Sequence, residues 1–433
     1  MIKSIIIFFP LVLLTFGEFS EFSKILFGNN AYRIIHYVVA PVAIFIPIVN
    51  GFVNKSLIMD KRIIISLFSL VMPIFVYVMY EIFVQILHGE TIVRSRSMLI
   101  SSLLLITFLI SLISYSKKNI HEFIKILLMP YVLFIFIISF FMVLFFLLHI
   151  FNFIDIFNYD SISQSQNNEG INVGGRESYI IFLFNLTFIE FSYYLFNLPR
   201  FQGLSIEPAT HAAIALPAFL FSNFLIKNSL LKYFIGSIIL IGVILTFSTT
   251  AYLVLLIMIA LFLAKYLVPF NSPYIILFLF LCFLGIIISV NYTFIEDSLE
   301  QSVLYDDGSF FAIQMRVLQE FFLLTGFHID KFNLMFSSKI FGEGFILPQS
   351  SFNNVGIVNV LLVFSIFIYL AFYSVRLFLK ENRYSKVSLG ILVFFLFAPK
   401  DIRFFISNPA VIYFAFMLCL IVSANKMQEQ IAK

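Results

Sequence analysis

Long apolar segments that recur along the whole chain limit what it can fold into. Hydrophobic residues make up 61% of the sequence and charged residues 12%, and the mean hydropathy is +1.04. Values of this kind lie far outside the range of soluble domains and place the chain in a lipid bilayer. Inside a bilayer, only helices and closed barrels satisfy every backbone hydrogen-bonding group. These segments are continuously apolar, whereas barrel strands alternate, so they predict helices.

The breaks between the segments define an all-α architecture. We predict one integral membrane domain over residues 1–433, a polytopic transmembrane helix bundle of about 12 spans of roughly the length that a bilayer requires. Two large external loops, about 153–208 and 293–352, are expected to contain short amphipathic helices. The predicted spans are 2–17, 32–53, 63–87, 98–114, 124–152, 209–226, 233–248, 249–264, 274–293, 353–374, 387–399 and 409–424.

Basic residues set the orientation, because lysine and arginine are enriched in cytoplasmic loops. Placing the N-terminus in the cytoplasm puts most of them inside. Both termini are then cytoplasmic and both large loops face the other compartment. The inside group is Lys55, Lys61, Arg62, Lys117, Lys118, Lys125, Lys227, Lys232, Lys265, Arg376, Lys380, Arg383, Lys386, Lys426 and Lys433, and the outside group is chiefly Lys24, Arg94, Arg96, Lys400 and Arg403.

The segment 179–198 leaves an alternative open, because it is apolar enough to span the bilayer. A further span there would move Arg200 inside, or would require another span to be dropped. However, the segment contains Glu190 and two asparagines, and its apolar residues alternate from Phe182 to Phe188 as in a strand. We therefore interpret it as an external or interfacial aromatic segment that returns without crossing.

Arg200 is the first candidate for a binding site, because it lies in a polar external loop. Glu207 and Pro208 follow, and proline suits the first position of a helix. A helix N-terminus beside a guanidinium is suited to binding an anion, such as a phosphate group. Gly203 would let the backbone approach a bulky ligand. The alternative is that Arg200 pairs with Glu207 and only anchors the helix.

Glu207 and His211 are the candidate general bases. A carboxyl group beside lipid can have a raised pKa and accept a proton near neutral pH. His211 follows four residues later, which places the two on one helical face if both are helical. The alternatives are a helix-start residue favoured by the dipole for Glu207 and a structural hydrogen bond for His211.

The remaining candidates are spread over the second half of the chain. Arg316 lies in the second external loop, where a guanidinium would hold phosphate oxygens or, alternatively, lipid headgroups. Ser248 and Thr249 belong to a polar break between two apolar segments, and Glu343 lies in a Gly-Glu-Gly turn, so all three could line the same cavity. Asp306 and its acidic neighbour lack further ligands at metal-binding spacing, so no metal is predicted.

Several short motifs together resemble one family of membrane enzymes. The run RFxGLxxEPxxHA begins at Arg200, and TFSTT follows the next apolar segments. A long external loop with one arginine then leads to FGEGF and SFNNVGIVNVLLVFSIF. This order resembles the bacterial O-antigen polymerase and O-antigen ligase superfamily. The resemblance covers about residues 200–370, and the rest of the chain agrees only in hydropathy and number of spans.

The resemblance implies a glycosyltransferase of the bacterial inner membrane that works at the periplasmic face. Its donor and acceptor would be undecaprenyl-diphosphate-linked oligosaccharides, and Arg200 and Arg316 would hold the diphosphate. The donor is already activated, so no cofactor is expected. A chain-length regulator protein is a candidate partner, and nucleic acid is not.

The polymerase is favoured over the ligase within this superfamily. Ligases tend to carry a histidine just after the glycine turn, and residues 348–354 contain none. The alternatives are an O-antigen ligase acting on lipid A core and a transporter of lipid-linked sugars or another anion. A transporter would need charged residues along a path inside the spans, whereas the strongest charges here lie in loops.

Overall fold

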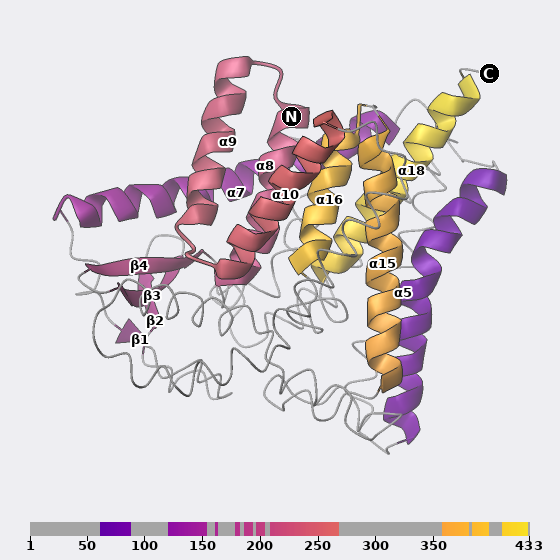
Figure 1. Ribbon diagram of the computed structural model, residues 1–433, viewed down its shortest axis with the longest axis horizontal. Helices are drawn as coiled ribbons and strands as arrows, with labels where there is room; N and C mark the ends of the chain where they lie inside the picture. Colours follow the sequence, from indigo (N-terminus) through magenta and orange to yellow (C-terminus); the bar gives the residue numbers. More distant parts are fainter. Residues whose placement is uncertain are drawn as a thin grey trace, which may run out of the picture. The chain divides into compact units, whose positions relative to one another are not determined.

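The computed structural model describes residues 61–87, 120–153, 161–162, 178–181, 186–193, 196–203, 208–267, 357–380, 383–397 and 409–431. Helices account for most of them, which confirms the predicted all-α class, and one antiparallel sheet is a local addition (Figure 1). The helices are α5 (Lys61–Leu87), α7 (Ile120–Ile150), α8 (Pro208–Leu225), α9 (Ser229–Ile244), α10 (Thr249–Leu267), α15 (Ile357–Leu379), α16 (Ser385–Phe397) and α18 (Pro409–Ile431). The strands are β1 (Ser161–Ile162), β2 (Ser178–Ile181), β3 (Leu186–Tyr193) and β4 (Phe196–Gly203).

Every helix among the described residues falls on a segment that the apolar pattern predicts as a span. The agreement is closest for α8, which begins at Pro208, as predicted for a proline at a helix start. Within the described part of the chain, α7 and α8 are long and apolar enough to cross a membrane. The predicted spans 2–17, 32–53, 98–114 and 274–293 lie outside the described residues, so the full number of spans stays a prediction.

The core between the helices is aromatic. Tyr131 of α7, Phe221 of α8, Phe394 of α16, and Tyr413 and Phe414 of α18 are all buried. The rings of Tyr131 and Tyr413 stack with centroids 6.0 Å apart, and those of Phe394 and Phe414 stack at 4.0 Å. The ring of Phe221 also lies beside that of Phe414, with centroids 6.2 Å apart, so the cluster joins four helices from separate parts of the sequence.

Two tyrosine hydroxyls join the same helices through hydrogen bonds. Tyr131 donates to the carbonyl oxygen of Ile214 in α8. Tyr413 donates to the carbonyl oxygen of Leu127 in α7, at 3.2 Å. Each carbonyl lies in the turn before a proline inside its own helix, where the missing proline N–H interrupts the regular backbone pattern. The tyrosines therefore hold α7, α8 and α18 together where two of these helices are locally weakened.

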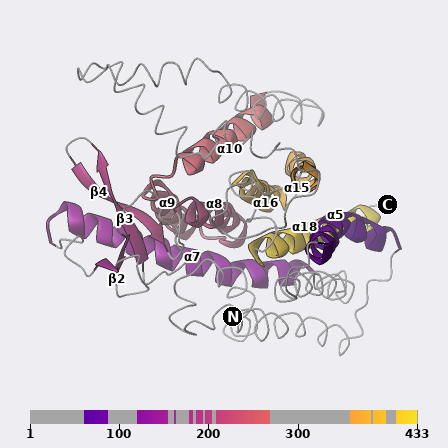
Figure 2. The same cartoon turned by 90° about the horizontal axis from the view of Figure 1, so that it is seen from below.

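Glycines allow the helices to approach closely. A Cβ atom at Gly242 of α9 would lie 2.7 Å from the Cβ of Ser139 on α7, and one at Gly390 of α16 would lie 2.5 Å from the ring of Phe221 on α8. Contacts through small residues are typical of helix packing in membranes. Figure 2 shows α8 and α9 nearly end-on while α7 runs across them, so α7 crosses its neighbours at a steep angle.

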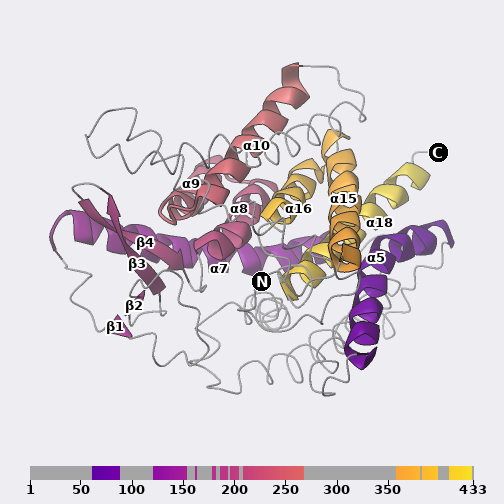
Figure 3. The same cartoon turned by 60° about the horizontal axis from the view of Figure 1, so that its bottom comes forward.

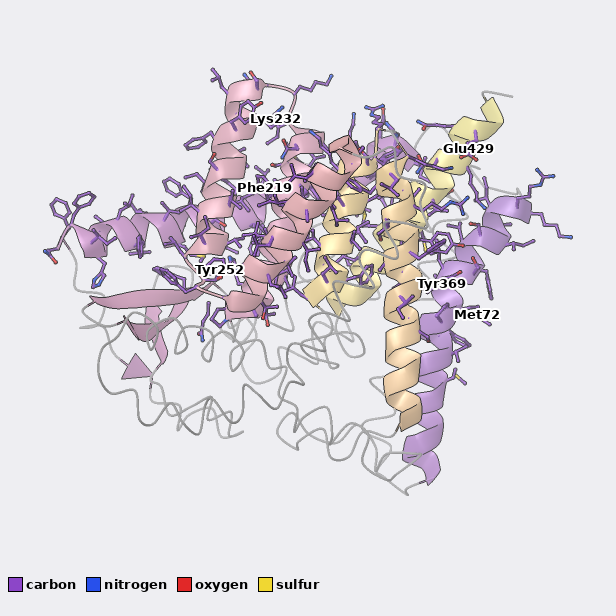
Figure 4. All side chains as sticks on the ribbon, viewed as in Figure 1. Met72, Phe219, Lys232, Tyr252, Tyr369 and Glu429 are labelled. Carbon is purple, nitrogen blue, oxygen red and sulfur yellow. The ribbon has the colours of Figure 1, made fainter. Side chains whose placement is uncertain are left out.

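Two helices are apolar on their exposed faces as well as on their buried ones. Ile138 and Met142 of α7 are buried, yet large apolar side chains spaced three or four residues apart are exposed along the same helix. A helix that is apolar all round is typical of a buried or membrane-embedded segment. The exposed side chains are Ile65, Phe68, Met72, Val76 and Met79 on α5, and Ile137, Phe140, Leu144, Leu147 and Ile150 on α7. Met72 is labelled in Figure 4.

The strands are connected in chain order as an antiparallel sheet, β1-β2-β3-β4. The alternation in the segment 179–198 correctly indicates extended structure at Leu186 and Phe188, although residues 182–185 lie outside the described residues. The prediction of short amphipathic helices in the first external loop is wrong for its described residues, which form strands. Alternating aromatic and β-branched side chains favour a pleated surface over a helix.

The backbone divides into two compact units, which are considered separately. One comprises Met1–Phe247 and Leu362–Lys433, and the other Ser248–Leu361. The first contains the sheet and all the described helices except α10 and the beginning of α15. The prediction of a single membrane domain stays a prediction.

Candidate functional site

Strand β4 carries Arg200 to the beginning of α8. The backbone of Arg200 pairs with Ile189 of β3, and the strand ends at Gly203. β4 packs against α7 and α8 (Figure 3). The strand that carries the backbone of Arg200 is therefore held by its pairing with β3 and by its packing against α7 and α8. The side chain of Arg200 lies outside the described part of the molecule.

A β-bulge interrupts β4 two residues after Arg200. Phe201 pairs with Phe188, but the next pair is Gly203 with Thr187, so Gln202 is an extra residue. Phe201 is fully buried and Gln202 is 4% exposed. Bulges bend a strand, redirect its side chains and are over-represented next to active sites. Local sequence gives no signal of this bulge apart from the glycine at position 203.

The end of β4 lies directly on the imidazole ring of His211. Gly203 has a φ of 64°, a conformation that favours glycine. A Cβ atom at this position would lie 2.3 Å from Nδ1 and 2.7 Å from Cε1 of His211. The structure thus shows a reason for the glycine that the sequence analysis did not give, because the missing side chain makes room for a ring of the same chain.

His211 is enclosed in the first turns of α8, and its side chain is 2% exposed. Its Nε2 atom is buried and has no hydrogen-bond partner among the residues that the structure describes. Glu207, the other candidate base, lies outside those residues, just before the first residue of α8. The predicted pairing of Glu207 with His211 therefore stays a prediction.

A backbone hydrogen bond joins β4 to the end of α9. The N–H of Phe201 donates to the carbonyl oxygen of Leu245 at 3.1 Å, and Leu245 is the C-cap of α9. Thr246 follows, is fully buried and donates from Oγ1 to the carbonyl oxygen of Val243 at 2.6 Å. Two separate motifs of the sequence, the run after Arg200 and the start of TFSTT, therefore meet here. A backbone hydrogen bond of this kind leaves no signal in the sequence.

Ser248 and Thr249 lie at the start of α10, in the second unit. Ser248 is buried, and its Oγ accepts a hydrogen bond from the N–H of Ala251 at 3.4 Å. Its carbonyl oxygen accepts from the N–H of Tyr252 at 3.0 Å. Ser248 therefore caps the helix, while Thr249 is the first helical residue and its side chain lies outside the description. Their predicted place in a substrate cavity stays a prediction.

The other candidates lie where the structure gives no description. Arg316, Glu343 and the acidic pair at Asp306 belong to residues outside the described ranges. Within the described residues, no group of three or more His, Cys, Asp or Glu side chains is arranged to hold a metal ion. The candidate site that the structure describes thus consists of β4, the first turns of α8 and the end of α9.

Comparison with family models, with curated proteins and with solved structures gives no match for this chain. Its function must therefore be argued from its own residues and their arrangement.

Proposed function

We propose that the chain is a surface-polysaccharide repeat-unit polymerase, an O-antigen polymerase of the bacterial inner membrane. It transfers the growing glycan from undecaprenyl diphosphate to a lipid-linked repeat unit on the periplasmic face. The observation that carries the proposal is the junction of β4 with α8 and α9. There the strand that bears Arg200 ends on His211 and is bonded to Leu245.

The exposed apolar faces of α5 and α7 support a location in the membrane. In a bilayer these apolar side chains contact lipid and not water, so their exposure carries no hydrophobic cost. At 31 residues, α7 is about 46 Å long at 1.5 Å per residue. It exceeds the hydrocarbon core of about 30 Å, and a span that is too long accommodates by tilting. The steep crossing of α7 over α8 and α9 fits such a tilted span.

The end of the helices opposite to β4 supports the proposed orientation. The C-terminal end of α8 meets the N-terminal ends of α7 and α16, where the ring of Tyr384 contacts those of Phe224 and His121. The corresponding helix ends carry basic residues, as the positive-inside bias requires of a cytoplasmic end. They are Lys125 near the start of α7, Lys232 in the first turn of α9, Arg376 in the last turn of α15 and Lys386 in the first turn of α16. Lys380, directly after α15, also forms an ion pair with Glu429 of α18 at 2.8 Å. The junction at β4 then faces the periplasm.

Cysteine labelling tests this orientation. Single cysteines at Asn167 and Asp307 should react with a membrane-impermeant thiol reagent from the periplasm, whereas those at Lys380 and Lys433 should react only after permeabilisation. A cytoplasmic signal at Asp307 would overturn the interpretation of the segment 179–198 as non-spanning.

The proposed reaction needs positive charge and one base. The acceptor hydroxyl oxygen forms a bond to the anomeric carbon of the donor, and the bond from that carbon to the diphosphate oxygen breaks. Negative charge grows on the leaving lipid diphosphate, and Arg200 and Arg316 stabilise it. Glu207 or His211 accepts the proton of the attacking hydroxyl. The diphosphate already activates the donor, so the transfer requires no nucleotide.

The length of the glycan on lipopolysaccharide tests the proposal. Deleting the gene should leave lipopolysaccharide that carries a single repeat unit, visible as one band on a gel. Complementation with the gene should restore the ladder of longer chains. Loss of every repeat unit from the core would contradict the polymerase and would indicate a ligase or an export step.

A further inference from the structure

The contact between Gly203 and His211 indicates what the histidine does. We infer that His211 is a positioning residue that fixes the end of β4, and through it the backbone of Arg200, and that it does not accept the substrate proton. This inference rests on the proposed function, because it assigns a role within that site. It leaves Glu207 as the candidate base.

The burial of the ring argues against direct contact with a substrate. A general base must come within about 2.6–3.2 Å of the hydroxyl whose proton it accepts, directly or through one water. His211 is 2% exposed, and the backbone of Gly203 covers the edge that bears Nδ1. A sugar hydroxyl would have to displace the end of β4 to reach this ring.

The same geometry explains how the ring would act on Arg200. β4 is held near its end at two points, by His211 beneath Gly203 and by Leu245, which accepts from the N–H of Phe201. Arg200 directly precedes Phe201, so these contacts set the position from which its side chain starts. A misplacement of about 1 Å can cost on the order of a hundredfold in rate. Removing the ring would therefore lower turnover without removing any reacting group.

Substitution can separate the shape of the ring from its nitrogens. Nε2 has no hydrogen-bond partner among the residues described by the structure, so an apolar ring would break no described bond through that atom. His211→Phe keeps a flat ring beneath Gly203 and has no titrating nitrogen. His211→Ala removes the ring. Comparing His211→Phe with His211→Ala therefore distinguishes a positioning role of the ring from a proton-accepting role.

The first experiment measures polymerisation of a lipid-diphosphate-linked repeat unit by the full-length protein in detergent. His211→Ala should lower kcat roughly tenfold or more, within the range for misplaced groups. His211→Phe should recover most of that loss and keep the parent's pH–rate profile. If His211→Phe keeps the parent's thermal midpoint but is as inactive as His211→Ala, the inference is wrong and His211 is the base.

The second experiment tests the contact itself through thermal midpoints, which need no substrate. Gly203→Ala should lower the midpoint, because its methyl group collides with the ring. Adding His211→Ala should recover part of the loss, although alanine at a positive φ remains strained. The matched control is Gly390→Ala with and without His211→Ala, where the two losses should add. Additive losses for the Gly203 pair would also overturn the inference.

The two proposals can fail separately. If deleting the gene leaves the long chains in place, the proposed function fails, while the coupling of Gly203 to His211 in the thermal midpoint can still hold. If the coupling is absent but Arg200→Ala abolishes long chains, the positioning role fails and the proposed function stands.

Discussion

Gly203 and Gly390 each lie directly against a ring, in two different regions of the same unit. Gly390 lies inside α16 and approaches Phe221 of α8 in the apolar core. Gly203 ends a strand in the left-handed region and approaches the polar ring of His211. The first contact serves helix packing, as small residues commonly do in membranes. The second contact combines an unusual backbone conformation, a β-bulge and a buried titratable side chain.

The difference between the two contacts supports the proposed site at Gly203 and His211. Helix packing alone accounts for Gly390, because it lies against the fully buried ring of Phe221. Packing alone does not explain why a buried histidine lies beneath a strand that bears Arg200. Residues that depart from local rules and are held by their surroundings cluster at functional sites.

Replacing either proposed diphosphate ligand should have the largest effect. Arg200→Ala and Arg316→Ala should each abolish long chains, while the protein still accumulates in the membrane. Lysine at either position should recover activity only in part, because an ammonium keeps the charge but loses the planar bidentate fork. Chain length on a lipopolysaccharide gel and the protein level in membranes are the measurements.

Arg403 provides the matched control for the two arginines, because it is predicted to lie outside but at the interface. Arg403→Ala should leave chain length nearly unchanged. A near-normal ladder in Arg200→Ala or in Arg316→Ala would reduce that residue to a lipid anchor.

Gly390→Ala should lower stability rather than act on the site. The added methyl group would meet a ring that is fully buried and cannot turn away. Overpacking of this kind costs about 1–3 kcal/mol. A lower thermal midpoint in detergent, with kcat unchanged in the protein that remains folded, is the expected result. A selective loss of kcat at an unchanged thermal midpoint would show that Gly390 does not serve packing alone, and would contradict the contrast with Gly203.

Tyr413→Phe should have a smaller effect, because it removes one hydrogen bond and keeps the ring. Its hydroxyl donates to the carbonyl oxygen of Leu127 in the buried core. A hydrogen bond of this kind contributes about 0.5–1.5 kcal/mol, and the thermal midpoint should fall accordingly. Tyr233→Phe is the matched control, since Tyr233 is 65% exposed on α9. Equal effects of the two substitutions would contradict the role given to the buried hydroxyl.

Gly236→Ala should have the smallest effect, and its sign should be favourable or neutral. A Cβ atom there would lie 3.4 Å from the ring of Phe219 on α8 (Figure 4), so the neighbour needs to give little or no room. Alanine is better than glycine inside a helix by up to about 1 kcal/mol. An unchanged or slightly higher thermal midpoint is expected. A fall as large as that of Gly390→Ala would show that distance to the ring does not decide these effects.

Local sequence determined the helices and several of their ends. Continuous apolar runs specify helices because lipid leaves the backbone no other partner, and Pro208 marks the start of α8 as predicted. The run from Arg200 to His211 also contains two residues, Gly203 and His211, that the structure brings into contact. The alternation around Phe188 was a correct signal for extended structure, although it did not reveal the sheet or its bulge.

Tertiary structure decided which of these residues meet. Tyr131 bonds to Ile214 across 83 residues and Tyr413 to Leu127 across 286, and no local period carries information over such distances. The contact of Gly203 with His211 is close in sequence, yet the sequence suggested space for a ligand where the fold places a ring. Periodicity and turn chemistry report which conformation a segment prefers, whereas contacts between segments depend on how their faces pack together.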